Sequence, residues 1–379
     1  MFELTEEQQM IRDTVRRISD NEVAPRAAAI DAEGKFPWDI KELFQRYELF
    51  GIDIPEEYGG MGIDHLATCI AEEEIARNCT ASSLILQVQA LAASVIVLGG
   101  SHEQKSKYLP RLASGEKLGA FALTEPGAGS DASAMATRAR RVGDKYVLNG
   151  LKHFISNGGI ADIYCVFAMT DPDKGVRGIS AFVVESSFPG FRVGKEEEKM
   201  GIRGSPTTEI LFEDCEVPAE NLLGNEGDGF RLAMKCLDKS RPVIAAQAVG
   251  IAQGALDYAI KYAKERIQFG KPIAALQGIQ FMLADMTTLV EAARSLTYRA
   301  AALVDKGTPE VPLMSAACKL FASDVAMKVT VDAVQVAGGF GYTKDLPLER
   351  YMRDAKITQI YEGTNQIQKV VIARRLGLG

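Results

Sequence analysis

Hydrophobic residues recur at helical spacing along the first part of the chain. This pattern covers three segments, Leu4 to Asn21, Asp39 to Tyr47 and His65 to Asn78. Thr5 and Gln8 resemble a capping box at the start of the first segment. Ser101 to Leu112 predicts a short capped helix that ends near Pro110. Residues 1–118 are therefore predicted to form an N-terminal α-helical domain.

The pattern changes between residues 119 and 226 to short runs of β-branched and aromatic residues. The runs are KLGAFALTE, DKYVLNGLKHFISN, DIYCVFAMT, GISAFVVES and TEILFEDCEV. Turn compositions such as PGAGSD, DPDKG, FPG and GNEGDG separate them. Strands do not alternate with helices here, so a doubly wound sheet is not expected. The segment predicts a compact middle β domain of barrel or sandwich type.

Helical spacing returns over residues 227–379, in longer segments rich in alanine. There are four of them: PVIAAQAVGIAQGALDYAIKYAKERI, QGIQFMLADMTTLVEAARSLTYRAAALVDKG, VPLMSAACKLFASDVAMKVTVDAVQVAGG and DAKITQIYEGTNQIQKVVIARRL. Four long helices with short connections predict a four-helix bundle. Several faces are apolar nearly all round, which predicts self-association. The fold class expected for the chain is α+β with three domains.

Composition excludes several classes of protein. The chain has 379 residues, 47% of them hydrophobic and 25% charged, as in soluble globular proteins of two or three domains. A net charge of -7 argues against binding to the nucleic-acid backbone. No uninterrupted apolar run approaches the length of a membrane span, and the acidic start MFELTEEQQM does not resemble a secretory signal. The six cysteines form no CxxC pair, so we expect a reducing cytoplasm.

Two segments of the β domain are candidates for ligand binding. FALTEPGAGSD places a glycine-rich turn after a strand, and its backbone N–H groups suit an anionic or carbonyl-rich ligand. It lacks the Lys-Ser/Thr pair of a P-loop, and the alternative is an ordinary surface turn. In LKHFISNGG, Phe154 and Ser156 are two residues apart and share a face of a strand. They could line a planar cofactor, or the strand could simply carry one core residue.

Two further candidates lie at the ends of predicted helices. In DKSRP, Pro242 suits the first turn of a helix, with Asp238 and Ser240 as cap candidates beside Arg241. The segment could bind a ligand, or it could only mark the start of a helix. In RIQFGKPIAALQ, a basic residue, an aromatic residue and a Gly-Lys-Pro turn separate two long helices. Such a cationic helix end could meet phosphates, or Arg266 could simply complement the helix dipole.

The last candidate is Glu362 in RYMRDAKITQIYEGTNQIQ, which follows Ile360-Tyr361 and precedes a Gly-Thr break. In a dry pocket its pKa would rise toward neutrality and suit a general base. The alternative is a solvated helix glutamate. The three histidines lie in no catalytic motif, and no His, Cys or carboxylate cluster has the spacing of a metal site.

Four stretches of the chain, taken together and in this order, resemble the acyl-CoA dehydrogenase family, in its short- and medium-chain branch. They are ALTEPGAGSD, RIQFGKPI, QVAGGFGYTKDLPLERYMRD and IYEGTNQIQ, and the resemblance covers essentially the whole chain. It implies a helical domain, a β domain and a four-helix bundle. It also implies FAD between the β domain and the bundle, in a homotetramer.

The resemblance also assigns roles to individual residues. Contacts to the flavin half of FAD are expected from Phe121, Leu123, Thr124, Ser130, Phe154 and Ser156. Contacts to its ADP half are expected, from a neighbouring subunit, at Arg266, Phe269, Gln277, Gln335, Gly338 and Gly339. Thr364 and Gln366 would complete the dinucleotide site. Acyl-CoA contacts are expected at Ser130, Asp238, Arg241 and Gly363.

By the same resemblance Glu362 is the catalytic base, which removes the α proton while a hydride leaves the β carbon for FAD. Some members carry the base on the helix leading to Arg241, where this chain has Ser240. The pocket floor, Ser82 to Ala93, has no arginine, which disfavours a dicarboxylic acyl group. A straight short or medium chain is expected, with branched, cyclic and aromatic groups as alternatives.

The expected electron acceptor is an electron-transfer flavoprotein. Two other functions remain open at this point: an acyl-CoA oxidase that uses oxygen, and a non-catalytic member that binds a partner protein. The chain lacks the additional C-terminal domain of the longer oxidases. It keeps the base and the FAD motifs that a non-catalytic member would lose.

Overall fold

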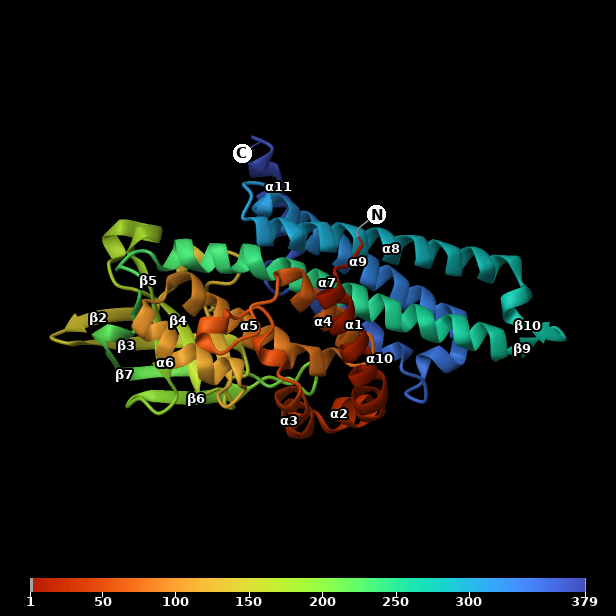
Figure 1. Ribbon diagram of the computed structural model, residues 1–379, viewed down its shortest axis with the longest axis horizontal. Helices are drawn as coiled ribbons and strands as arrows, with labels where there is room; N and C mark the ends of the chain where they lie inside the picture. Colours follow the sequence, from red (N-terminus) through yellow and green to blue (C-terminus); the bar gives the residue numbers. More distant parts are fainter. Residues whose placement is uncertain (1–2, 379) are drawn as a thin grey trace.

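Helices form the first part of the chain in the computed structural model, which describes residues 3–378 (Figure 1). They are α1 (Glu6–Ile18), α2 (Ala27–Glu33), α3 (Trp38–Arg46), α4 (His65–Ala76), α5 (Thr80–Gly99) and α6 (His102–Ala113). The capping box of Thr5 and Gln8 is confirmed, with both reciprocal hydrogen bonds formed. The expected end near Pro110 is wrong, because α6 continues to Ala113 and buries Leu112 beyond the proline.

Helix α5 is mostly apolar and almost entirely buried, so its sequence lacks the amphipathic period found in α1, α3 and α10. By length and composition, α5 and the later helix Gly229–Glu265 could each cross a membrane. In the fold, 83% and 78% of their most apolar windows are buried against protein. Both helices therefore lie in the protein core.

The middle part is an eight-stranded sheet. Its strands are β1 (Gly119–Ala122), β2 (Arg138–Val142), β3 (Lys145–Ser156), β4 (Ile163–Met169), β5 (Ile179–Glu185), β6 (Phe191–Glu196), β7 (Thr207–Pro218) and β8 (Leu222–Leu223). The order is β6-β7-β3-β2-β4-β5-β8, and β1 pairs in parallel with β4. All five predicted strands are present. The strands β2, β6 and β8 were not predicted, because β2 and β6 are largely exposed and contain charged residues, and β8 has only two residues.

The last part is helical again. It comprises α7 (Gly229–Glu265), the hairpin β9 (Ile267–Gln268) and β10 (Lys271–Pro272), α8 (Gln277–Lys306), α9 (Val311–Ala337), α10 (Leu348–Thr358) and α11 (Asn365–Arg375). The order of helical, β and helical parts is confirmed. The fourth predicted helix is two helices, α10 and α11, joined by a turn that contains Glu362.

The predicted helix start at Asp238 to Pro242 is wrong, because α7 runs through this segment with Pro242 inside it. Residues on both sides of the proline are buried, so packing maintains a helix that local sequence would end. Near the proline, the Lys239 carbonyl oxygen has a hydrogen-bond partner outside α7, because His65 Nε2 lies 2.7 Å from it.

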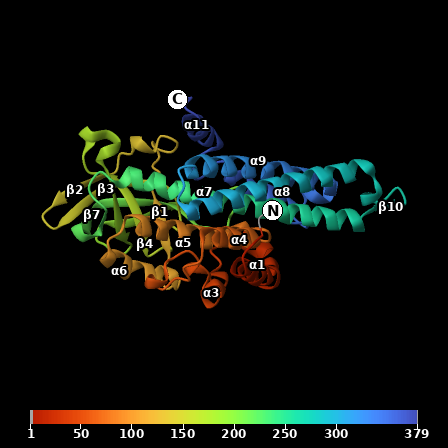
Figure 2. The same cartoon turned by 45° about the horizontal axis from the view of Figure 1, so that its top comes forward.

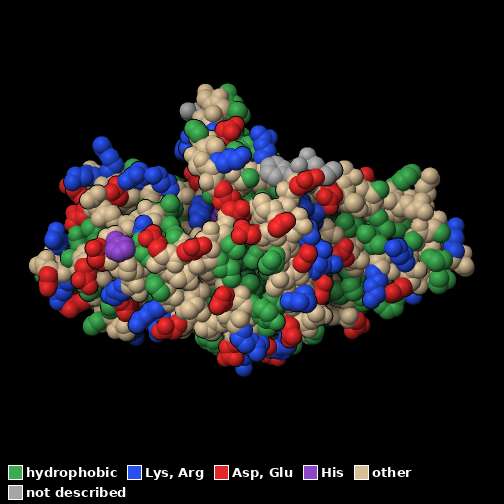
Figure 3. All heavy atoms as spheres, in the orientation of Figure 1, with side chains coloured by type: hydrophobic (Ala, Val, Ile, Leu, Met, Phe, Trp, Pro, Cys, Tyr) green, Lys and Arg blue, Asp and Glu red, His purple; other side chains and the backbone are tan. Residues whose placement is uncertain are grey.

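Helix α7 connects the parts in space. It begins over the sheet, near β5, and runs between α4, α8 and α9 to the hairpin at the far end of the molecule (Figures 1 and 2). Irregular turns link the other elements: a π-helical turn at Ser19–Val23 and 3-10 turns at Ala24–Arg26, Leu49–Gly51, Glu56–Tyr58, Ala132–Ala134, Pro172–Gly178, Ala219–Asn221, Ile273–Ala275 and Gly338–Tyr342. Acidic and basic side chains are interspersed over most of the face in Figure 3.

Candidate active site

Glu362 lies in the turn between α10 and α11, with its backbone in the left-handed region. The φ angles are 51° for Glu362 and 93° for Gly363. A left-handed non-glycine residue costs free energy and persists only where its surroundings hold it. Gln368 Nε2 donates to the carbonyl oxygens of Glu362 and Gly363 at 3.2 and 2.8 Å. Thr364 caps α11 by accepting from the backbone N–H of Ile367.

Two side chains from separate helices donate to the Glu362 carboxylate. Gln87 Nε2 on α5 donates to Oε1, and Ser240 Oγ on α7 donates to Oε2. Burial raises the pKa of Glu362 to about 7, against the opposing effects of the Ser240 hydrogen bond, the Arg241 and Lys319 charges and the Gln87 hydrogen bond. A carboxylate with this pKa is partly ionised at neutral pH, as a general base requires.

Asp238 and Arg241 form an ion pair on α7, close to this carboxylate. Arg241 Nη1 lies 2.5 Å from Asp238 Oδ1, and the arginine side chain is 4% exposed. Burial raises the pKa of Asp238, and the arginine only partly opposes this. The Arg241 charge also favours ionisation of Glu362. The structure thus brings Asp238 and Arg241 to the segment of α7 that contacts Glu362 through Ser240.

A buried polar cluster continues from Tyr361, the residue before Glu362. The Tyr361 hydroxyl donates to Gln247 Oε1 on α7. Gln247 Nε2 donates to Glu72 Oε1 on α4 and Ser83 Oγ on α5, at 2.8 and 2.9 Å. Burial raises the pKa of Glu72 to about 8, so this carboxyl is mostly protonated at neutral pH. The cluster fills the space between α4, α5 and α7 beside the candidate base.

The glycine-rich turn after β1 is tied to β3 by a buried ion pair. Glu125 accepts from Lys152 Nζ at 2.7 Å and from the backbone N–H groups of Ala136 and Thr137. Lys152 Nζ also donates to the Leu123 carbonyl oxygen at 3.0 Å. Burial lowers the pKa of Lys152 to about 8, while the Glu125 charge opposes the shift. The predicted flavin-contact segments, Phe121 to Ser130 and Phe154 to Ser156, therefore lie side by side.

Phe154 does not lie on a regular strand, although its two-residue spacing from Ser156 was interpreted as placing both on one strand face. Its φ is 56°, and a register shift between Lys152 and Ile155 marks a bulge in β3. The side chain of Phe154 is 60% exposed, whereas Ile155 is buried. Ser130 is also exposed, and Ser156 is half-buried. The bulge leaves an aromatic face open beside the glycine-rich turn, a setting that fits a planar ring.

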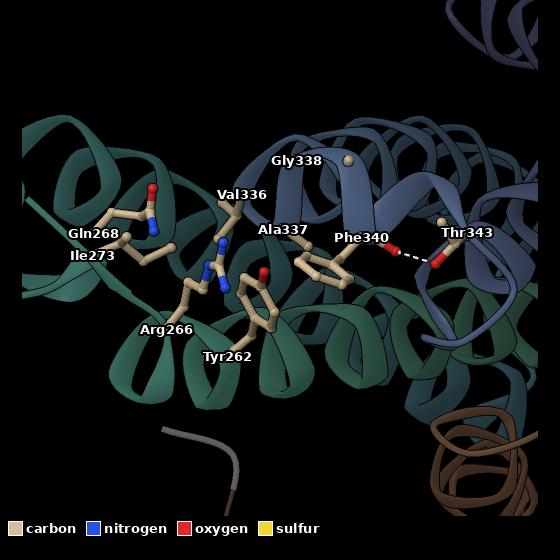
Figure 4. Close-up of a pocket in the computed structure, with 10 residues that line it drawn as sticks. Tyr262, Arg266, Gln268, Ile273, Val336, Ala337, Gly338, Phe340 and Thr343 are labelled. Atoms are coloured by element: carbon tan, nitrogen blue, oxygen red, sulfur yellow. Dashed lines mark hydrogen bonds between the residues drawn. The ribbon is translucent and has the colours of Figure 1, made fainter.

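The residues predicted to meet ADP lie at the other end of α7 (Figures 1 and 4). Arg266 caps the C-terminus of α7, and its guanidinium lies 5.2 Å from the Phe340 ring centroid. Together with Gly338 and Gly339 they line a pocket of about 440 Å³, shared with Tyr262, Gln268, Ile273, Val336, Ala337 and Thr343. A guanidinium beside an open Gly-Gly turn fits phosphate oxygens.

Other predicted dinucleotide contacts surround this region. Phe269 is 90% exposed at the β9–β10 hairpin, and Gln277 and Gln335 are exposed on α8 and α9. Thr364 and Gln366 lie instead at the start of α11, close to Glu362. One chain therefore holds two half-sites, one at the sheet and one at the hairpin end. A guanidinium beside a Gly-Gly turn at one of them and an open aromatic face beside a glycine-rich turn at the other are chemically suited to FAD.

Sequence reasoning missed several residues of the site. Gln247, Lys319 and the pair Glu125–Lys152 were not singled out as functional residues, and Gln87 was expected only within the pocket floor, not as a partner of Glu362. Gln87, Gln247 and Lys319 are polar residues within largely apolar stretches of α5, α7 and α9, and that was the available signal. Among residues 3–378 no group of three or more His, Cys, Asp or Glu side chains could hold a metal ion.

Comparison with known proteins follows the same division of the chain. The models of the acyl-CoA dehydrogenase N-terminal, middle and C-terminal domains match residues 5–116, 120–215 and 227–377. A short-chain-specific acyl-CoA dehydrogenase of Clostridium acetobutylicum is 52% identical over 376 residues, 99% of each chain.

Two other similar proteins differ in the acyl group that their names give. A cyclohex-1-ene-1-carbonyl-CoA dehydrogenase of Syntrophus aciditrophicus is 53% identical over 379 residues, 99% of this chain and 91% of that protein. The structure of butyryl-CoA dehydrogenase from Megasphaera elsdenii superposes with a TM-score of 0.97 at 47% identity, over 99% of each chain.

Proposed function

The chain belongs to the acyl-CoA dehydrogenase family, and we propose that Glu362 is its catalytic base and that its substrate is a short, straight-chain acyl-CoA. The expected family, three-part fold and FAD dependence are confirmed. The enzyme is an oxidoreductase that desaturates an acyl-CoA thioester. The identity of the base, the acyl group and the subunit arrangement are the proposed parts.

The reaction removes two hydrogens from adjacent carbons of the acyl group. The Glu362 carboxylate takes the α proton, and the electron pair of that C–H bond forms the new α,β double bond. FAD, when bound, accepts the hydride that leaves the β carbon. The thioester carbonyl must be polarised at the same time, and the backbone N–H of Glu362 is the donor that we assign to it. Arg241 and Ser240 keep the carboxylate ionisable near neutral pH.

The Glu362 carboxylate, held by donors from two helices with a pKa near 7, is the observation that carries this proposal. Glu362→Gln should retain FAD but lose the bleaching of the flavin by acyl-CoA under anaerobic conditions. Glu7→Gln, on the exposed face of α1, serves as the matched control and should bleach normally. Undiminished bleaching in Glu362→Gln would overturn the assignment of the base.

The buried polar cluster beside Glu362 limits the length of the acyl group that can bind. Tyr361, Gln247, Glu72 and Ser83 are joined by hydrogen bonds, so a long alkyl tail would have to displace a connected polar network. This supports a short acyl group. Among butyryl-, hexanoyl-, octanoyl- and cyclohexanecarbonyl-CoA, we expect kcat/KM for flavin reduction to be largest for butyryl-CoA. The cyclic substrate is the second candidate, because a relative named for a cyclohexene acyl group is 53% identical.

The two separated half-sites support an oligomer, and we propose a homotetramer. Large apolar side chains are exposed around the hairpin and the end of α9, among them Ile267, Phe269, Phe340 and Tyr342. Two inactive variants, Arg266→Ala and Phe154→Ala, should regain FAD when co-expressed, because a mixed oligomer contains one intact composite site. Sedimentation equilibrium measures the number of subunits.

We further propose an electron-transfer flavoprotein as acceptor and the cytoplasm as location. An oxidase would instead produce peroxide in air without any other acceptor. A non-catalytic binding protein would stay colourless after FAD addition. We also propose the domain joints at residues 118 and 226, since β1 begins at Gly119 and α7 at Gly229.

A further inference from the structure

Lys319 is a fully buried lysine on α9 that the reaction described above does not use. Its Nζ donates to the Gly363 carbonyl oxygen at 2.8 Å and to Asn365 Oδ1 at 3.0 Å. Among residues 3–378, no carboxylate oxygen lies within 4.0 Å of this nitrogen. An ammonium group without an adjacent counter-ion is costly to bury, so its presence here needs a reason.

Both acceptors of Lys319 belong to the turn that carries Glu362. Gly363 follows the base directly, and Asn365 opens α11. Ser323 Oγ on α9 also donates to Asn365 Oδ1, at 3.1 Å. Asn365 Nδ2 in turn donates to Asp324 Oδ1 at 2.8 Å. Helix α9 thus supplies further contacts to the turn, in addition to those from Gln87 on α5 and Ser240 on α7.

A positive charge at position 319 is not needed to hold the turn by hydrogen bonding. Gln368 Nε2, a neutral donor, already reaches the Gly363 carbonyl oxygen at 2.8 Å. The neighbours of Lys319 along α9 are buried and uncharged: Cys318 and Ala322 are apolar, and Ser315 and Ser323 carry neutral hydroxyls. A neutral side chain at position 319 would therefore avoid the desolvation cost and still leave the turn a donor.

We propose that Lys319 is a positioning residue that fixes the turn carrying Glu362 and balances the negative charge of its carboxylate when the base is ionised. This rests on the proposed role of Glu362. The charged groups that act on the pair are Arg241 on α7, Asp324 on α9 and Glu72 on α4, whereas α5 supplies only the neutral Gln87.

Ionisation of the two groups should be linked. Burial lowers the pKa of Lys319 to about 7, the Glu362 charge raises it, and Arg241 lowers it. Burial raises the pKa of Glu362 to about 7 as well. The two protons therefore belong to a coupled pair. Loss of the lysine charge disfavours the ionised carboxylate, so the pKa of the base should rise.

Lys319→Gln tests the charge, because the amide keeps a donor for the turn but carries no charge. Lys319→Met removes both. The rate of anaerobic flavin reduction by butyryl-CoA should fall roughly fivefold to tenfold at pH 7 in Lys319→Gln and recover above about pH 9, a rise of about one unit in the pKa of the base. Lys328→Met, on the same helix but in a surface ion pair with Asp332, should leave the profile unchanged.

Infrared difference spectroscopy supplies a readout that does not depend on catalysis. The carboxylic acid C=O stretch of protonated Glu362 is identified by its loss in Glu362→Gln and is then titrated in wild type and Lys319→Gln. A titration displaced to higher pH in the variant supports the proposal even if the base lies elsewhere. An unchanged titration, or a rate reduced equally at every pH, overturns the charge-balancing role. If Lys319→Met does not fold, Lys319→Gln still decides the matter.

Discussion

Ser240 offers the sharpest test of how the base is tuned. Its hydroxyl donates to Glu362 Oε2, and the change to alanine removes this donor with little change in volume. A hydrogen bond to a charged group contributes about 1.5–3 kcal/mol. At about 1.36 kcal/mol per pKa unit, its loss should raise the pKa of Glu362 by about 1 to 2 units. The pKa would then move from about 7 to about 8–9.

The expected rate follows from the ionised fraction. At pH 7 that fraction falls from about one half to between about one in ten and one in a hundred, so flavin reduction should slow about fivefold to fiftyfold. Above about pH 9.5 the variant should approach the wild-type rate, since the carboxylate is then ionised in both proteins.

The assay is stopped-flow flavin reduction by butyryl-CoA across pH, with the FAD content of each preparation measured. Ser94→Ala is the control, because Ser94 is a buried serine on α5 beyond the contact made by Gln87. A Ser240→Ala profile that coincides with wild type would show that the hydroxyl does not tune the base. A rate lowered equally at every pH would show that the serine acts on geometry alone.

Three further variants test other parts of the structure. Gln247→Gly should shift the preference toward hexanoyl- and octanoyl-CoA, because each additional buried CH₂ contributes about 0.8 kcal/mol, or about fourfold in kcat/KM; an unchanged order among the thioesters would contradict this. Lys152→Met should destabilise the protein by about 3–5 kcal/mol in urea unfolding and weaken FAD retention, because it leaves the Glu125 carboxylate buried without its ion-pair partner. Glu72→Gln should flatten the fall of Tm with pH: the pKa of Glu72 is raised from 4.5 to about 8, so its contribution to stability is present below about pH 4.5 and is lost as pH rises through about 8. Equal Tm slopes in wild type and variant between pH 5 and 9 would refute that account.

The sequence predicted the parts of the fold that depend on local patterns. Helix periodicity, the Thr5–Gln8 capping box and the five strands rich in β-branched and aromatic residues all depend on residues close together in the chain. It failed at Pro242, where burial of α7 on both sides outweighs the local preference for a helix start. The hydrophobic pattern alone did not mark α5, and the segment Ser82 to Ala93 was expected to be helical only from the family resemblance.

The candidate site shows the same limit more clearly. Glu362 could be proposed from its position before a Gly-Thr break, since a kink is a local signal. Its partners Gln87 and Ser240 are 275 and 122 residues away in the chain, and only packing brings them to the carboxylate. A single polar residue in an apolar helix is visible in the sequence, but the group that it contacts is not.

Helix α7 carries residues of the candidate catalytic centre and of the pocket at Arg266, and it keeps the two apart within one chain. Its middle presents Ser240 and Arg241 to Glu362, and Gln247 to Tyr361. Its C-terminus presents Arg266 beside the Gly338–Gly339 turn, at the end remote from the sheet. A straight helix of 37 residues spans about 55 Å, so a ligand bound at the sheet cannot reach the pocket at Arg266 of the same chain. If the two half-sites bind one FAD, the length of α7 therefore requires that they belong to different subunits, and the variants Arg266→Ala and Phe154→Ala should complement each other.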